Sequence, residues 1–165
     1  MPLEGDALDA FLREPHLAHF ATVGPDRAPR VRPLWFCFAE GALWFTTRLE
    51  ARRTGADVLA GSSVAVSIAS EDRPYRAVLA YGTPEVWERD RERWLERIAT
   101  RYGEAEGRRW LGGALKEPDR VVMRFVPDRV VAWHYGTGDY TLMQKGDSMR
   151  IELPAEPPAT RPSDV

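Results

Sequence analysis

An apolar segment at residues 42–48, Ala-Leu-Trp-Phe-Thr-Thr-Arg, runs directly into a segment that begins with cations. The first segment has the composition of a strand, and residues 51–60 have the apolar spacing of a helix. Arg52 and Arg53 would then lie in the first helical turn. Each costs about 0.3–1 kcal/mol there, because a helix N-terminus already carries partial positive charge. The chain therefore has to bring a strand end, a helix start and several guanidinium groups together.

Arg48 adds a third guanidinium group to this cluster. A phosphate is the anion that suits it best, because helix N-termini and planar guanidinium groups both bind phosphate oxygens. The alternative is a solvated helix face, for which Arg53 and Asp57 have the required i,i+4 spacing. Such a pair stabilises a helix by only a few tenths of a kcal/mol, so we favour the anion site.

The composition indicates one compact domain. With 165 residues and 44% hydrophobic content, the chain can bury a substantial core, which we place in residues 1–150. Prolines exclude regular structure in residues 151–165, so this tail is either mobile or an arm lying on a partner. A net charge of -2 and a pI near 6.0 argue against a dedicated nucleic-acid binder.

The expected environment is a reducing cytoplasm. Cys37 is the single cysteine, so no intrachain disulfide forms, and its aromatic surroundings favour a small core hydrophobe. No apolar run approaches the roughly 20 residues that cross a bilayer. Residues 1–15 also lack the basic-then-apolar order of a signal peptide. We therefore expect a soluble protein without membrane contact.

Hydrophobic periodicity predicts that strands dominate the fold. Strands are expected at residues 17–23, 29–38, 42–47, 64–70, 76–87, 121–126 and 129–134, the last two forming a hairpin. Helices are expected at residues 6–14 with Asp6 as a cap, 51–60, 89–102, and 106–115 with a break at Gly112-Gly113.

In the second helix, at residues 51–60, we expect Ala51, Gly55, Val58 and Leu59 on one apolar face. Gly55 weakens this helix, so tertiary contacts or a ligand must help to hold it. Gly82 and Pro84 suggest a bulge or an edge. This order predicts a mainly β (α+β) fold, a small antiparallel barrel with helices packed outside.

Pro33 lies inside one of these predicted strands, where its missing N–H interrupts the ladder. A planar heterocycle with its own donors and acceptors suits such a gap. Trp35 would border it, with Trp44 and Phe45 across the hairpin. The alternative is that these aromatic residues belong to the core or to a dimer interface.

Motifs of other chemistries are missing. There is no G-x-G-x-x-G, no G-x-x-x-x-G-K and no G-x-S-x-G, which argues against a Rossmann site, a P-loop and a nucleophile elbow. His16 and His19 are expected on opposite faces, so we predict no metal site. His134 either contacts a ligand or ends a strand. The catalytic residues stay unassigned.

Several short segments have an order and spacing that resemble a known family. They are Phe11-Leu12-Arg13-Glu14-Pro15, Ala21-Thr22-Val23-Gly24-Pro25-Asp26, Arg32-Pro33-Leu34-Trp35-Phe36, Leu43-Trp44-Phe45-Thr46-Thr47-Arg48 with Ala51-Arg52-Arg53, Ser63-Val64-Ala65-Val66-Ser67 and Tyr81-Gly82-Thr83-Pro84-Glu85-Val86. Over about residues 8–135 the chain is similar to the pyridoxamine 5'-phosphate oxidase-like, FMN-binding split β-barrel superfamily. The resemblance implies a split antiparallel β-barrel that forms a homodimer, with a flavin or deazaflavin cofactor in the groove between subunits.

The resemblance also implies roles for individual residues. The cofactor ring lies along Arg32, Pro33, Leu34 and Trp35. Its phosphate lies at the strand end with Thr46 and Thr47, bound by Thr47, Arg52 and Arg53, and Arg48 is a further candidate. The substrate side is expected at His134, Tyr135 and Tyr140.

Two departures narrow the family expectation. Ala51 stands where oxidase-type members commonly have a Ser before a basic pair, which removes one hydroxyl donor. Trp133-His134-Tyr135-Gly136 replaces the Trp-x-x-Arg-Pro segment of genuine pyridoxamine phosphate oxidases, so that substrate is not expected. The chain resembles the smaller branch of FMN-binding proteins and reductases that use coenzyme F420.

The first hypothesis for function is a dimeric oxidoreductase that moves a hydride between FMN, or alternatively F420, and a small organic substrate. A second is a binding or carrier protein for a flavin, a deazaflavin or haem, without turnover. A third is a partner-binding barrel whose arginine cluster is only surface charge.

Overall fold

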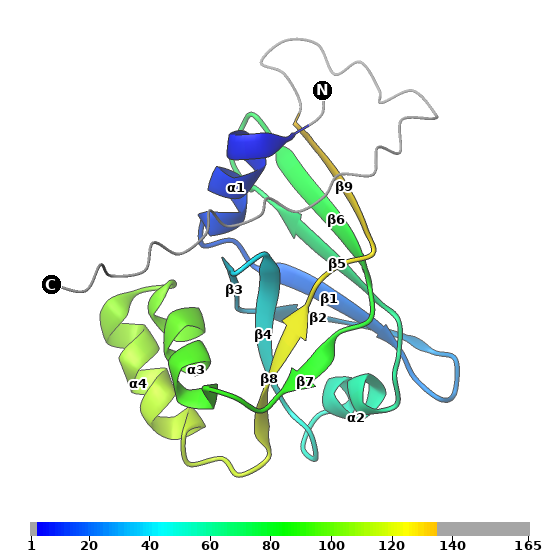
Figure 1. Cartoon of the computed structure of the whole chain (residues 1–165), viewed down its shortest axis with the longest axis vertical. Coiled ribbons are helices and arrows are strands. Elements are labelled where there is room, and N and C mark those ends of the chain that lie inside the picture. Colours follow the sequence, from blue (N-terminus) through cyan, green and yellow to red (C-terminus); the bar gives the residue numbers. More distant parts are fainter. Residues whose placement is uncertain (1–2, 135–165) are drawn as a thin grey trace, which may run out of the picture.

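The computed structural model describes residues 3–134, which form two antiparallel sheets and four helices (Figure 1). Tyr135, Tyr140 and the predicted tail at residues 151–165 lie outside this range. The strands are β1 Ala18–Val23, β2 Pro29–Leu34, β3 Phe36–Ala39, β4 Ala42–Arg48, β5 Val64–Ala69, β6 Arg76–Gly82, β7 Glu85–Trp87, β8 Arg120–Phe125 and β9 Arg129–His134. The helices are α1 Gly5–Arg13, α2 Arg53–Leu59, α3 Arg91–Thr100 and α4 Glu104–Ala114.

The nine strands divide between a five-stranded sheet, in the order β2-β1-β5-β6-β9, and a four-stranded sheet, in the order β3-β4-β8-β7. The chain changes sheet at Trp35, at residues 49–63, which include α2, at residues 83–84 and at residues 126–128. The single strands predicted at residues 29–38 and 76–87 are therefore each two strands in different sheets. The predicted last hairpin is also wrong, because β8 pairs with β4 and β7 while β9 pairs with β6.

Gly82 marks one of these crossings. Its φ is +159°, and a Cβ there would lie 3.1 Å from the backbone N of Asp128. The N–H of Asp128 donates to the carbonyl of Tyr81 at 2.8 Å, so two crossings lie against each other. The interruption suggested by Gly82 and Pro84 is thus a change of sheet, which periodicity does not distinguish from a bulge.

The larger core cluster includes side chains from both sheets. Phe20 of the five-stranded sheet packs edge-on against Phe45 of the four-stranded sheet, with ring centroids 5.0 Å apart. A second cluster joins the four-stranded sheet to α3, where Trp44 stacks on Trp94 at 3.5 Å. Trp44 and Phe45 are 1% and 0% exposed, so they are core residues, as one of the sequence alternatives predicted.

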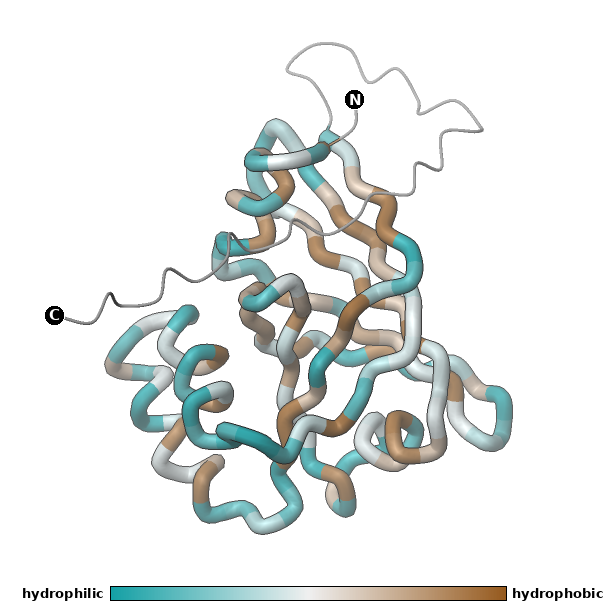
Figure 2. The backbone as a smooth tube through the Cα atoms, viewed as in Figure 1, coloured by the Kyte–Doolittle hydropathy of each residue, from teal (hydrophilic) through white to brown (hydrophobic). Residues whose placement is uncertain are grey.

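The two helices of the α3–α4 pair lie side by side next to the four-stranded sheet (Figure 1). Helix α1 lies above them in this view, and its C-terminal end is bound by Arg101, which follows α3 and donates to the carbonyl of Leu12 at 2.7 Å. Most residues of α3 are hydrophilic (Figure 2). Only Trp94, Leu95, Ile98 and Ala99 of this helix are buried against the rest of the protein. Helix α4 continues through Gly112-Gly113, contrary to the predicted break. The close approach at Gly107, where a Cβ would meet backbone atoms of Ala99, packs α4 against α3.

Helix boundaries differ from the sequence predictions in two places. Glu4 is the N-cap residue of α1, and Asp6 lies in its first turn instead of capping it. Helix α2 is shorter than predicted, with Arg52 as its N-cap residue and Arg53 as its first residue. Leu59, expected on the apolar face of α2, is 60% exposed, because the buried face consists of Thr54, Gly55, Asp57 and Val58. Within residues 3–134, no helix has the length and apolar character needed to span a membrane.

Candidate functional site

A cavity of about 310 Å³, called here the β2–β4 cavity, lies where the ends of these two strands meet. Its lining contains seven of the nine residues predicted for the cofactor, together with one residue that the sequence did not indicate. The lining residues are Arg32, Pro33, Leu34, Thr46, Thr47, Arg48, Arg52 and Arg120. Residues from β2, β4, β8 and the start of α2 thus converge on one space.

Strand β2 contributes an unpaired edge to this site. It is the first strand of the five-stranded sheet and pairs only with β1, where Pro33 lies opposite His19. Proline is tolerated on an edge strand, because its missing N–H removes no hydrogen bond on the open side. The predicted interruption of the ladder at Pro33 is therefore located at a sheet edge that borders the cavity.

Helix α2 is brought to the strand end by Gly55. A Cβ at this position would lie 2.6 Å from the carbonyl O of Arg48 and 2.6 Å from the Cα of Leu49. Only glycine permits this backbone contact, which places Arg52 at the cavity. The tertiary contact expected to hold Gly55 is thus a direct contact with the chain leaving β4.

The buried carboxylate of Asp57 fixes α2 to the neighbouring strands. Thr22 on β1 donates its hydroxyl to Asp57 Oδ2 at 2.7 Å, and Arg30 on β2 approaches both carboxylate oxygens at 3.4 Å. The i,i+4 pair between Arg53 and Asp57, which the sequence offered as the alternative to an anion site, does not form, because Asp57 faces the strands and is 3% exposed. Its partners come from residues distant in sequence, which helical spacing does not indicate.

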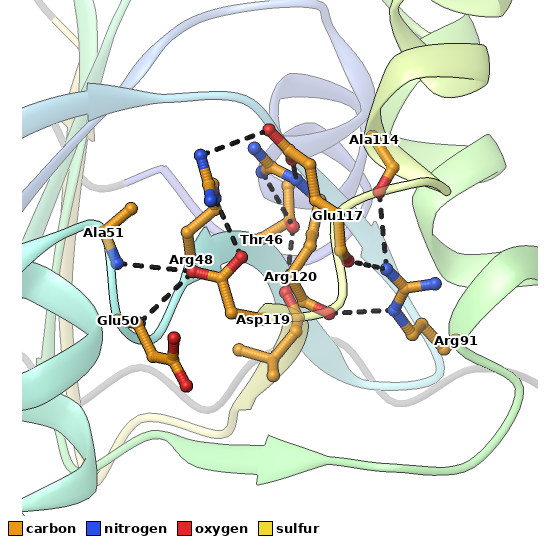
Figure 3. A network of polar contacts seen from close by, with 10 residues as sticks. Thr46, Arg48, Glu50, Ala51, Arg91, Ala114, Glu117, Asp119 and Arg120 are labelled. Carbon is orange, nitrogen blue, oxygen red and sulfur yellow. Dashed lines mark hydrogen bonds and ion pairs between the residues drawn. The ribbon is translucent and has the colours of Figure 1, made fainter.

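Two of the four cavity arginines are already paired with carboxylates (Figure 3). Arg48 donates from Nε to Asp119 Oδ1 at 2.9 Å and lies 3.5 Å from Glu117. Arg120 is paired with Glu117 and approaches the Thr46 hydroxyl at 3.4 Å. The carboxylates of Glu117 and Asp119 do not line the cavity, so they contact the two guanidinium groups from outside it.

Asp119 also binds the backbone that precedes α2. Its Oδ2 accepts from the N–H groups of Glu50 and Ala51, each at 3.3 Å (Figure 3). Its own carbonyl accepts from Leu49 N–H at 2.9 Å. The carboxylate of Asp119 is therefore an anion, supplied by the protein itself, at the turn between β4 and α2. Burial raises the pKa of Asp119, but the hydrogen bonds from Arg48 and Ala51 outweigh it, so the net pKa is lowered. The hydrogen bond from Arg120 lowers the pKa of Glu117 in the same way.

The remaining cations have no such partner. Within residues 3–134, the side chains of Arg32, Arg52 and Arg53 make no hydrogen bond or ion pair. Arg32 and Arg52 line the cavity, whereas Arg53, exposed at the start of α2, does not. The cavity thus contains two guanidinium groups held by carboxylates and two available for an added anion.

The hydroxyl groups of the two lining threonines, Thr46 and Thr47, also differ in whether they already have a partner. The hydroxyl of Thr46 donates to the carbonyl of Val121 at 2.8 Å, so its proton is already used. The hydroxyl of Thr47 has no partner among the described residues. Thr47 is consequently the hydroxyl in this lining that can donate to a ligand.

Other predicted site residues lie elsewhere. Trp35 is not part of the lining, because its ring stacks on Tyr102 at 4.9 Å, beside α3 and α4. His134 ends β9 opposite Arg76 and is also outside the lining. Sequence reasoning missed Arg120, Glu117 and Asp119. The one signal for them is the charged segment Lys-Glu-Pro-Asp-Arg at residues 116–120, immediately before a predicted strand.

Two antiparallel sheets around a shared core, with a cationic cavity at the strand ends, define an α+β fold consistent with a split barrel. The chain belongs to the pyridoxamine 5'-phosphate oxidase family, whose PNPOx_N model matches residues 5–134. Comparison of the sequence with curated proteins gives no match.

Solved structures with the same fold include proteins of different described function. An F420 reductase is 25% identical, with a TM-score of 0.61 over 76% of this chain and 97% of its own. The conserved protein Rv2991 of Mycobacterium tuberculosis is 21% identical, with a TM-score of 0.65 over 86% of this chain and 96% of its own. HutZ, the haem storage protein of Vibrio cholerae, is 20% identical, with a TM-score of 0.61 over 80% of this chain and 96% of its own. At these identities the last two show the fold alone.

Proposed function

We propose that this protein is an oxidoreductase that binds a flavin-type cofactor, FMN or the deazaflavin F420, through a phosphate group in the β2–β4 cavity. The observation that carries the proposal is the pair of unpartnered guanidinium groups, Arg32 and Arg52, on a lining that also offers the free hydroxyl of Thr47. Guanidinium groups and hydroxyl donors are the groups that bind phosphate oxygens well.

The residues of the cavity fit such a cofactor in two parts. Arg52 and Thr47 would bind the phosphate, and Arg48 and Arg120, held by Asp119 and Glu117, would add fixed positive charge. The edge of β2 would lie along the ring, where Pro33 and Leu34 offer apolar surface and Arg32 offers charge. The cofactor supplies hydride transfer when bound, while the protein orients it and excludes water.

A homodimer is part of the proposal. The cavity volume of about 310 Å³ lies at the lower end of the range for ligand sites. Strand β2 is an unpaired edge, and Val31 on it is 63% exposed. An exposed edge strand with an apolar side chain favours contact with another chain, and a second copy there would extend the walls of the site.

The comparisons support both candidate cofactors. Membership of the pyridoxamine 5'-phosphate oxidase family favours FMN. The similarity to an F420 reductase, which covers 97% of that protein, favours F420. The carrier function receives support only from the fold of HutZ, so we place it second.

The experiment that tests the proposal starts from freshly purified protein. A visible absorption spectrum and mass spectrometry of the molecule released on denaturation identify any bound cofactor, and fluorescence titration with FMN and with F420 measures affinity. Saturable binding of either cofactor, followed by its reduction or oxidation with a nicotinamide or quinone substrate, supports the oxidoreductase. Binding without turnover supports the carrier, and no binding of either cofactor refutes the proposal.

A further inference from the structure

Arg91 is the first residue of α3, and it contacts a segment that serves the β2–β4 cavity without lining the cavity itself. Residues 114–120 run from the end of α4 to the start of β8 and are called here the α4–β8 segment. Arg91 donates from Nε to the carbonyl of Arg120 at 2.8 Å, and from Nη2 to the carbonyls of Glu117 at 2.9 Å and Ala114 at 3.3 Å (Figure 3). One side chain therefore binds the start, the middle and the end of this segment.

The backbone hydrogen bonds within the α4–β8 segment are short-range. The N–H of Glu117 donates to the carbonyl of Ala114 at 3.2 Å, and the N–H of Arg120 donates to that of Glu117 at 3.3 Å. Such bonds set local turns, but they do not set the position of the segment relative to a neighbouring helix. Arg91 supplies this second constraint, because a guanidinium group is planar and its N–H donors have a fixed arrangement. Its charge also suits the C-terminal end of α4, where the helix carbonyls carry partial negative charge.

The carboxylates of the same segment bind two arginines of the cavity. Asp119 accepts from Nε of Arg48 at 2.9 Å, and Glu117 accepts from Nε of Arg120. The side chains of Asp119 and Arg120 are 7% and 14% exposed, so water screens each ion pair only in part. Few rotatable bonds separate the two carboxylates from the backbone that Arg91 binds. A displacement of this backbone would therefore move both carboxylates relative to the cavity.

We infer that Arg91 is a positioning residue for the β2–β4 cavity. By binding three carbonyls of the α4–β8 segment, it keeps Glu117 and Asp119 where they orient Arg120 and Arg48 toward an anion in the cavity. The effect on cofactor affinity rests on the proposed function, whereas the orientation of the two arginines is a property of the protein without cofactor. Among the described residues, α3 and α4 contribute none to the lining, and Arg91 gives this helix pair a role at the site.

The test is NMR of the Nε–H groups of arginine in the full chain, recorded without cofactor. A hydrogen bond to a carboxylate shifts an Nε–H resonance and slows its exchange with water. Arg91→Lys keeps the positive charge at the end of α4 but cannot bind three carbonyls together. We expect the Nε–H resonances of Arg48 and Arg120 to shift and to exchange faster in this variant. Arg93→Lys makes the same substitution two residues later, where the side chain binds Glu40 at 2.9 Å, and should leave both resonances unchanged.

Two further measurements complete the test. In the wild-type protein, the Nε–H of Arg91 should exchange slowly with water, because it donates to the carbonyl of Arg120. This measurement needs no variant, so it applies even if Arg91→Lys fails to fold. Fluorescence titration with FMN or F420 should show about fivefold lower affinity for Arg91→Lys and less than about twofold change for Arg93→Lys. Unfolding in urea separates this effect from a loss of stability, which alone leaves the affinity of the folded protein unchanged.

Four outcomes would overturn the inference. Fast exchange of the Arg91 Nε–H in the wild type would refute the carbonyl contacts. Unchanged resonances of Arg48 and Arg120 in Arg91→Lys, or equal changes in Arg93→Lys, would refute the positioning of these arginines by Arg91. Shifted resonances with unchanged cofactor affinity would refute its role at the site. Absence of cofactor binding by the wild type refutes the proposed function instead, and the cofactor-free resonances then decide the inference by themselves.

Discussion

Arg48 and Asp119 form an ion pair of 2.9 Å at the point where β4 ends, and the second oxygen of the same carboxylate accepts two backbone N–H groups from the turn that follows. One side chain therefore fixes both a guanidinium group of the β2–β4 cavity and the approach to Arg52. Arg91 supports this arrangement from α3, because it donates to the carbonyls of Arg120, Ala114 and Glu117 (Figure 3).

Asp119→Asn should weaken cofactor binding without unfolding the protein. The amide still reaches the turn, but it loses the charge that orients Arg48, so we expect roughly tenfold lower affinity for FMN or F420. Fluorescence titration measures the affinity. Glu106→Gln, an exposed carboxyl on α4, is the control and should leave it unchanged. Equal affinities for Asp119→Asn and the wild type would show that Arg48 does not need this partner.

Arg52→Glu and Arg53→Glu form a matched pair of charge reversals. The two residues are adjacent, and neither side chain has a partner within residues 3–134, but only Arg52 lines the cavity. We expect Arg52→Glu to lower cofactor affinity by about tenfold or more and Arg53→Glu by about threefold or less. Equal losses of cofactor affinity in the two variants would indicate that Arg53 also binds the phosphate, as predicted from the family resemblance.

Gly55→Ala should destabilise the fold. Its Cβ would lie 2.6 Å from two backbone atoms of the chain leaving β4, which cannot move as a flexible side chain can. We expect a loss of about 1–3 kcal/mol in the free energy of unfolding, measured with urea. Gly112→Ala is the control, because a Cβ at this position in α4 meets no atom within 4 Å. It should stabilise the protein by about 0.5–1 kcal/mol, since alanine is the better helix former. A stable Gly55→Ala variant would contradict the close contact.

Stability should decrease in acid. The hydrogen bond from Arg76 lowers the pKa of Glu14, and that from Arg120 lowers the pKa of Glu117, each from an ordinary value of 4.5. A carboxyl whose pKa is lower in the folded state stabilises the protein fully above its unfolded pKa, and this contribution is lost as pH falls below it. The melting temperature should therefore be constant near neutrality and decrease below about pH 4.5.

The double variant Glu14→Gln and Glu117→Gln identifies the groups responsible for this pH dependence. It should be less stable than the wild type at pH 7 and should show a shallower decrease between pH 5 and pH 3. Parallel melting curves for the two proteins across that range would mean that other carboxyl groups are responsible.

Local patterns in the sequence predicted the position of most strands, and the family resemblance placed Arg32, Thr47, Arg48 and Arg52 in one site, where the cavity lining brings them together. Periodicity identifies a strand but not the sheet to which it belongs, so the change of sheet at Trp35 was not foreseen. Trp35 itself was predicted beside a ring, and it stacks on Tyr102, which lies 67 positions later. That contact depends on how α3 packs on the sheet.

The pairing of charges was the least predictable feature. Helical spacing offered Arg53 as an alternative partner for Asp57, but the partners of Asp57 are Thr22 on β1 and Arg30 on β2. The arginine cluster predicted a bound phosphate near the turn after β4, which stays a prediction, and it did not indicate that the carboxylate of Asp119, more than 60 residues away, binds this turn. Interactions between distant residues leave no local pattern.

The division of the strands has a consequence for biosynthesis. The five-stranded sheet lacks its last strand until β9 has been made, and the four-stranded sheet is incomplete until β8 has been made. No contiguous fragment that stops short of β8 contains either sheet in full. During translation, neither layer can therefore be completed before residues 1–125 have left the ribosome, and the four-stranded layer has all its strands one strand earlier than the five-stranded layer.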